Sequence, residues 1–172
     1  MSISKQGTNQ RRVCLAVDGS NHASHAVDWY LSELYKPGDY VVFVHCLEAP
    51  NLPTMTVSSG LSIPIDSWTK ALQENIEQTN KLRNEYGYLC EAKHIPHDFA
   101  VMNASRPGDG IVRAVEQYGA NMIVMGCRGL GAVKRAFIGS VSDYVLHHAE
   151  QPTVFLFNPP TSIRLCSGNF HS

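Results

Sequence analysis

The chain has 172 residues, of which 44% are apolar, and this size and composition suit a single globular domain with an ordinary core. Its 14 basic and 15 acidic residues give a formal net charge of -1, so no overall field would attract a nucleic-acid backbone or an anionic membrane surface. No strong local cluster of basic residues replaces that field, and we therefore expect neither nucleic acid nor a membrane as a partner.

The cysteines and the N-terminal residues favour a cytoplasmic location. The cysteines are odd in number, none forms a C-x-x-C pair, and two lie inside apolar runs, where a reduced thiol behaves as a small hydrophobe. Residues 1–12 are polar, which predicts a flexible N-terminus without the apolar stretch of a signal peptide. No apolar run reaches the length that spans a bilayer, so we expect a soluble protein in a reducing compartment.

The first part of the chain predicts two buried strands and one helix. Residues 13–17 form a continuous apolar run that ends at the turn Asp18-Gly-Ser20, as expected of a strand covered on both faces. Ser20 is a suitable N-cap for a helix that continues to about Leu34, and the Lys-Pro-Gly of residues 36–38 stops it. Residues 40–46 predict the second buried strand.

A long loop and a long helix are predicted next. Residues 49–66 hold three prolines, one glycine and several hydroxyl residues without a sustained period, so we expect a mobile loop that is able to cover a site. Apolar residues at helical spacing predict a helix from about Ser67 to Tyr86, with Gly87 at its C-terminal cap. The third strand falls within residues 89–102, where Pro96 makes it an edge strand or an interrupted one.

The alternation of helix and strand continues to the end of the domain. Residues 107–118 predict a helix, with a proline in its first turn and a glycine after its end. The fourth strand covers residues 121–125, and after a glycine-rich stretch a helix is predicted from about residue 140 to 150. Residues 153–157 predict the fifth strand, so that the domain spans residues 13–158 and residues 159–172 form a polar C-terminal tail.

Buried strands that alternate with amphipathic helices indicate a single-domain α/β fold, with a mainly parallel sheet covered by helices on both faces. In such sheets the ligand binds beyond the carboxyl ends of the strands, where the strand order reverses. Two of these ends carry polar or glycine-rich residues, at Asp18 after the first strand and from Gly126 onward after the fourth. We therefore expect the functional site at these two strand ends.

The stretch from Gly126 to Ser140 matches neither common phosphate-binding pattern. No glycine in it is followed by Lys and a hydroxyl residue, as a P-loop requires. The dinucleotide pattern that starts at Gly129 has Lys134 where its third glycine belongs, and it follows the fourth strand instead of the first. What remains is the pattern G-x2-G-x9-G-[ST], formed by Gly126, Gly129, Gly139 and Ser140.

This spacing suits the binding of an anion. Gly126 and Gly129 lack a Cβ, so the chain can turn sharply off the strand and bring backbone N–H groups close to a phosphate or a ribose. Gly139 and Ser140 begin a helix, whose first N–H groups and dipole favour negative charge. Two plainer interpretations stay open, namely Ser140 as a cap of that helix and Asp18 as a turn-forming residue.

With this motif the chain resembles the nucleotide-binding branch of the universal stress protein family, over about residues 13–157 and including the aspartate after the first strand. The resemblance implies an open parallel five-stranded sheet of order 3-2-1-4-5, Rossmann-like and of the adenine nucleotide alpha hydrolase type. It also implies a homodimer that pairs through the last strand, Thr153 to Phe157.

The resemblance further implies which residues contact the ligand. Adenine and ribose contacts would fall on Ala16, Val17, Asp18, Cys46, Met125 and Gly126. Phosphate contacts would fall on Arg128, Gly129, Gly139, Ser140, Val141 and Ser142. The ligand would be ATP, AMP or ADP, with Mg or Mn bound through the nucleotide phosphates. Cys46 stands where the family often has valine, and the expected contact there is through the backbone.

The sequence supports three functions. The first is an adenine-nucleotide-binding universal stress protein that acts as a stress-response sensor or regulatory module. The second is slow ATP hydrolysis or phosphotransfer, although no serine-histidine-acid or cysteine-histidine set can be assembled and we name no catalytic residue. The third is a dimeric scaffold that binds no nucleotide. His22 and His25 lie three apart without a carboxylate or cysteine beside them, so we expect no protein-bound metal.

Overall fold

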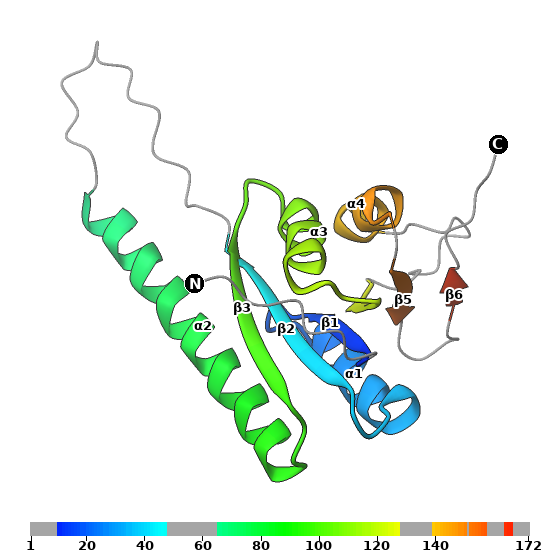
Figure 1. The fold of residues 1–172 in the computed structure, drawn as a ribbon. Helices are drawn as coiled ribbons and strands as arrows, with labels where there is room; N and C mark the ends of the chain where they lie inside the picture. The colour runs from blue at the N-terminus through cyan, green and yellow to red at the C-terminus, as the bar shows by residue number, and fades with distance from the viewer. Residues whose placement is uncertain (1–9, 48–64, 128–138, 151, 158–163, 167–172) are drawn as a thin grey trace.

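The computed structural model describes residues 10–47, 65–127, 139–150, 152–157 and 164–166. These residues form one six-stranded sheet in the order β3-β2-β1-β4-β5-β6 (Figure 1). The strands are β1 (Arg12–Ala16), β2 (Tyr40–Leu47), β3 (His97–Asn103), β4 (Met122–Gly126), β5 (Thr153–Phe157) and β6 (Arg164–Cys166). The first five are parallel, which confirms the predicted order 3-2-1-4-5, and β6 runs antiparallel to β5.

Helices cover both faces of the sheet, as predicted. They are α1 (Asn21–Trp29), which continues as the short π-helix η1 (Tyr30–Leu34), α2 (Ile65–Ala92), α3 (Pro107–Tyr118) and α4 (Ser140–His148). Buried residues of α1 and α2 pack in one core, and those of α3 and α4 pack in the other. Figure 1 shows these two layers on either side of the strands.

The central strand explains why its sequence is a continuous apolar run. Val13 and Leu15 belong to the core under α1 and α2, whereas Cys14 between them belongs to the core under α3 and α4. Side chains alternate across a strand, so a strand that is covered on both faces has no polar face. All three side chains are accordingly buried.

The second helix differs from its prediction at both ends. It starts at Ile65, within the predicted loop, and continues through Gly87 to Ala92. Residues Leu82, Tyr86 and Cys90, each one turn further along, are buried against the sheet. A glycine inside a helix costs only about 1 kcal/mol relative to alanine, and burial of the Cys90 turn outweighs that cost. The chain leaves the helix instead at His94, whose φ is 53°.

The third strand lies in the predicted region, residues 89–102, and ends one residue beyond it. Because α2 continues to Ala92, β3 begins only at His97, immediately after Pro96. Its place at the edge of the sheet agrees with the expectation drawn from Pro96. Of the loop predicted for residues 49–66, residues 49–64 lie outside the described residues.

The C-terminal tail contributes a strand that the sequence did not reveal. Residues 164–166 pair with residues 154–156 of β5, with Phe155 opposite Leu165 at the centre. The outer edge of β5 is therefore covered by residues of the same chain. A homodimer through this edge stays a prediction.

A buried carboxylate joins three segments at the start of β2. Asp39 accepts hydrogen bonds from Arg11 Nε (2.7 Å), from the Tyr30 hydroxyl (2.7 Å) and from the Lys36 amide (3.0 Å). Arg11 also donates to the carbonyl of Leu34, in the last turn of η1. This network fixes the end of the first helical segment against the entry of the sheet.

Candidate functional site

A cavity of about 380 Å³ lies at the carboxyl ends of β1 and β4, where the strand order reverses. Its walls come from β1 and the turn after it, from β2 and β4, and from the first residues of α1, α3 and α4. The lining residues are Ala16, Val17, Asp18, Ser20, His22, Ala23, Val44, Cys46, Pro107, Ile111, Met125, Gly126, Gly139, Ser140, Val141 and Ser142. This is the position at which parallel α/β sheets bind their ligands.

Every sequence-predicted site residue that the structure describes lines this cavity. These residues are Ala16, Val17, Asp18, Cys46, Met125, Gly126, Gly139, Ser140, Val141 and Ser142. Arg128 and Gly129 lie outside the described residues. Segments up to 126 positions apart in the chain, such as Ala16 and Ser142, thus meet at one place.

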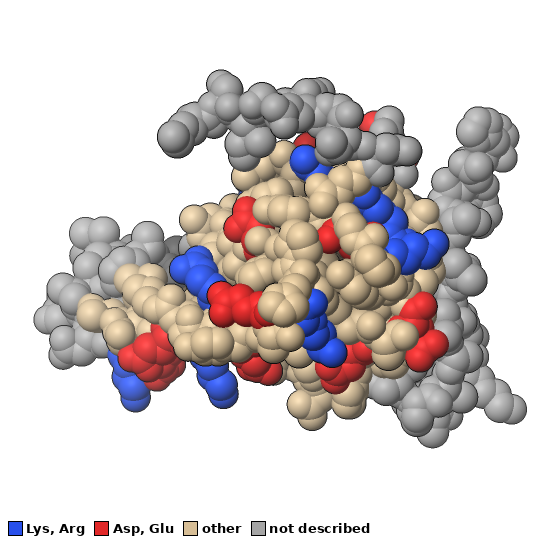
Figure 2. All heavy atoms as spheres, turned by 60° about the horizontal axis from the view of Figure 1, so that its bottom comes forward, with Lys and Arg blue, Asp and Glu red and all other residues tan. Residues whose placement is uncertain are grey.

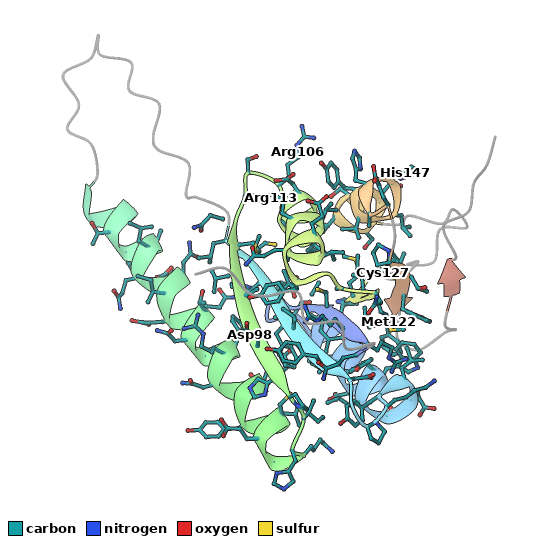
Figure 3. The ribbon with its side chains drawn as sticks, viewed as in Figure 1. Asp98, Arg106, Arg113, Met122, Cys127 and His147 are labelled. Atoms are coloured by element: carbon teal, nitrogen blue, oxygen red, sulfur yellow. The ribbon has the colours of Figure 1, made fainter. Side chains whose placement is uncertain are left out.

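Six lining residues were missed by sequence reasoning. They are Ser20, His22, Ala23, Val44, Pro107 and Ile111. For Pro107 a signal was present, because a helix that starts directly after a parallel strand begins at the carboxyl edge of the sheet. In Figure 3, Arg106 marks the start of α3. Met122 marks the amino end of β4 in the same view, and Cys127 follows its carboxyl end.

The turn after β1 presents the Asp18 carboxylate at the mouth of the cavity. Asp18 Oδ1 accepts a hydrogen bond from the Ser20 amide at 2.9 Å, and Gly19 between them has a φ of 78°, which favours glycine. Ser20 Oγ in turn accepts from the Ala23 amide at 3.3 Å and caps α1, as predicted. Asp18 therefore does form the turn, and it is also exposed at the cavity.

Gly126 is required by packing. A Cβ at this position would lie 2.4 Å from the carbonyl carbon and oxygen of His22 and 2.8 Å from the Ala23 nitrogen. The first turn of α1 thus rests directly on the end of β4. This close approach is a second reason for glycine at this position, beside the predicted turn off the strand, and it brings the start of α1 to the cavity wall.

The start of α4 lacks a side-chain cap. Gly139 is its N-cap, and Ser140 is the first helical residue, so the interpretation of Ser140 as the cap is wrong. The Asp143 amide donates to the Gly139 carbonyl at 2.9 Å, and no capping box forms. The first-turn N–H groups of this helix are the ones that a bound anion can satisfy. Ser142 in this turn is buried.

The inner wall of the cavity is apolar. Ala16, Val44 and Met125 come from three adjacent strands, and Ile111 faces them from α3. Cys46 Sγ donates to the Pro107 carbonyl at 3.2 Å and ties the end of β2 to the start of α3. An apolar wall beside an uncapped helix start suits a ligand with a flat ring at one end and an anionic group at the other.

The close approach of α3 depends on two glycines in its first turn. A Cβ at Gly110 would lie 2.7 Å from Cys46 Sγ, and a Cβ at Gly108 would lie 2.7 Å from Tyr144 Cδ1 of α4. These glycines let α3 pack against the sheet and against α4 together. The run Pro-Gly-Asp-Gly from Pro107 was the sequence signal for this packing.

The described residues hold no group of three or more His, Cys, Asp or Glu side chains that could bind a metal ion. His22 lines the cavity, and His25 is exposed on the same helix. On the face shown in Figure 2, basic and acidic side chains of the described residues lie interspersed. No helix in the described part of the chain is long and apolar enough to cross a membrane.

Known proteins with the same fold and related sequences identify the family. The model of the universal stress protein family matches residues 9–156 of this chain. A universal stress protein of Thermus aquaticus, encoded next to a sulfhydrylase gene, is 32% identical over 146 residues, which cover 85% of this chain and 98% of that protein.

Two solved structures share the fold. One is a universal stress protein family member from Arabidopsis thaliana with AMP bound, with a TM-score of 0.62, 20% identity, and coverage of 86% of this chain and 91% of that one. The other is a universal stress protein in complex with cAMP, with a TM-score of 0.53, 17% identity, and coverage of 88% and 98%. The family match over most of the chain and the close relative agree, and the chain belongs to the universal stress protein family.

Proposed function

We propose that this universal stress protein binds an adenine nucleotide, ATP, ADP or AMP, in the cavity between β1 and β4, and acts as a stress-response sensor or regulatory module. The observation that carries the proposal is the uncapped start of α4 beside an apolar wall at the point where the strand order reverses. A nucleotide has the matching pair of ends, a flat base and a phosphate chain.

The lining residues divide between the two ends of such a ligand. Ala16, Val44 and Met125 line the apolar wall, against which we propose that the base lies, and Asp18, which also lines the cavity, would accept hydrogen bonds from the ribose hydroxyls. The phosphates fit the first turn of α4, from Gly139 to Ser142, where the helix dipole and several N–H groups act together. Arg128 and Gly129 of the glycine motif are further proposed phosphate contacts, and Mg or Mn would be held by the phosphates.

Relatives support the choice of ligand. The solved family members with bound AMP and bound cAMP show that this fold carries adenine nucleotides in other proteins. In this chain the glycine motif, the aspartate after β1 and the cavity occur together. We therefore propose nucleotide binding as the function of the cavity.

The test is the substitution Ser140→Asp. A carboxylate at the first residue of α4 favours the helix dipole and keeps the fold, but it repels a phosphate at the same place. We expect the dissociation constant for ATP, measured by calorimetry, to rise about tenfold or more, which corresponds to about 1.4 kcal/mol.

The control is Asn121→Asp, which lies directly before β4, at the amino ends of the strands and away from the cavity. This variant adds the same charge and keeps the oxygen that accepts a hydrogen bond from the Arg12 amide, so ATP affinity should not change. Equal ATP affinity of Ser140→Asp and the parent protein would contradict the proposed site. Steady phosphate release above that of Ser140→Asp would support slow ATP hydrolysis, and a parent protein without affinity for any adenine nucleotide would support the scaffold function.

A further inference from the structure

Two side chains from other elements hold consecutive carbonyls of the turn after β1. His45 of β2 places Nδ1 at 2.8 Å from the Val17 carbonyl oxygen. Gln78 of α2 donates from Nε2 to the Asp18 carbonyl oxygen at 3.1 Å. Asp18 lines the cavity, whereas neither Gln78 nor any other described side chain of α2 belongs to its lining.

These contacts fix the orientation of the peptide groups in the turn after β1. The Val17 amide donates to the Val44 carbonyl at 2.9 Å, so the next amide, that of Asp18, faces the β4 side of β1. Met125 and Gly126 line the cavity on that side. A trans peptide sets its C=O and N–H groups in opposite directions, so a carbonyl held at His45 keeps the Asp18 amide turned toward β4.

His45 is suited to this task because it is buried. Its side chain is 5% exposed, and since a carbonyl oxygen can only accept, the ring must carry its proton on Nδ1. A buried carbonyl that lost this donor would be left unsatisfied, and the turn would move to satisfy it.

Gln78 packs closely against Gly19 in the turn. A Cβ at Gly19 would lie 3.2 Å from Gln78 Nε2, and the φ of 78° at Gly19 also favours glycine. Gln78 is otherwise exposed, so its contact with Asp18 is separable from the packing of α2.

We propose that His45 and Gln78 are positioning residues of the nucleotide site, which hold the Val17–Asp18 backbone so that Asp18 faces the bound ligand. The inference rests on the proposed function.

The first test is Gln78→Met, which keeps side-chain length and helix propensity but removes the donor. We expect the dissociation constant for ATP to rise roughly 3- to 10-fold, as for one lost hydrogen bond, with an unchanged melting temperature. The matched control is Gln73→Met on the same helix, where the amide donates to Glu77 Oε1 at 3.0 Å, and ATP affinity should stay that of the parent.

A second test distinguishes a role of His45 and Gln78 in positioning Asp18 from a role in the stability of the fold. Asn carries its amide nitrogen on Cγ, as His carries Nδ1, so His45→Asn should retain ATP affinity better than His45→Leu at a temperature where both variants are folded. In an Asp18→Ala background, which lacks the acceptor for the ribose hydroxyls, Gln78→Met should cause no further loss, because Gln78 acts through Asp18. Additive losses, or Gln78→Met affinity within twofold of the parent, would overturn this inference alone. A parent protein that binds no adenine nucleotide would overturn the proposed function and this inference together.

Discussion

At Gly126 one absent carbon atom decides how closely α1 approaches the sheet. We predict that Gly126→Ala lowers the free energy of unfolding by about 1–3 kcal/mol, because its Cβ would meet the backbone of His22 at 2.4 Å. Gly87→Ala is the matched substitution. It lies inside α2, where the nearest atom to a new Cβ is His97 Nε2 at 3.8 Å, so it should stabilise the protein by about 0.4–1 kcal/mol. Urea denaturation of both variants measures the contrast, and equal effects would refute the packing argument.

Asp39 gives the protein a defined sensitivity to acid. Burial by itself would raise the pKa of Asp39, but the hydrogen bonds from Arg11, from the Lys36 amide and from Tyr30 hold that pKa below its ordinary value of 3.8. A lowered folded-state pKa stabilises the fold above the unfolded-state pKa, and the contribution is lost as the pH falls through the folded-state pKa. Stability from this group should be complete at neutral pH and decline below about pH 4.

Removing the charge tests this assignment. Asp39→Asn should lower the free energy of unfolding at neutral pH by about 2 kcal/mol, because Arg11 and Tyr30 lose a charged acceptor. The variant should also lose part of the acid dependence seen in denaturation curves between about pH 2 and 6. Asp28→Asn, at an exposed position of α1, should leave both properties close to those of the parent.

Among the elements, β6 occupies the strand edge through which the dimer was predicted. The outer side of β5 pairs with residues 164–166, and the family resemblance predicts a dimer through that side. An edge strand offers one row of backbone groups and accepts one neighbour. We predict that deletion of residues 159–172 shifts the protein toward dimer in sedimentation velocity experiments, whereas deletion of residues 167–172, which keeps β6, does not. Monomers in both cases would contradict a dimer through β5.

Elements with a strong local signal were predictable from the sequence, and those set by distant contacts were not. The buried runs of β1, β2, β4 and β5 stood out because both faces are covered, and Ser20 and Gly119 marked helix ends by local chemistry. The extension of α2 past Gly87 depends on Cys90 meeting the sheet, which no local rule contains. Among the described residues, the three of β6 pair with β5 alone, so their own pattern carried little signal.

At the site, the sequence motif identified the residues that line the cavity but not the structural roles that these residues have. Gly126 and Asp18 were singled out as ligand contacts, yet the structure also gives them packing and turn roles that depend on His22 and Ser20. His45 and Gln78 were passed over, because a histidine within an apolar strand and a glutamine on a helix surface have no distinguishing pattern. Only the fold brings them beside Val17 and Asp18.

For the whole molecule, the place of β1 at the centre of the sheet has a consequence during synthesis. β1 and β2 leave the ribosome early, but the other edge of β1 waits for β4, and the Arg12 amide meets Asn121 only 109 residues later. At about 5–20 residues per second, that edge stays open for roughly 5–20 s. The cavity needs Ser142 as well, so a ligand cannot assist folding until most of the chain has been made. The edge of β1 that faces β4 therefore stays unpaired until late in synthesis, before any ligand of the cavity is able to stabilise the fold.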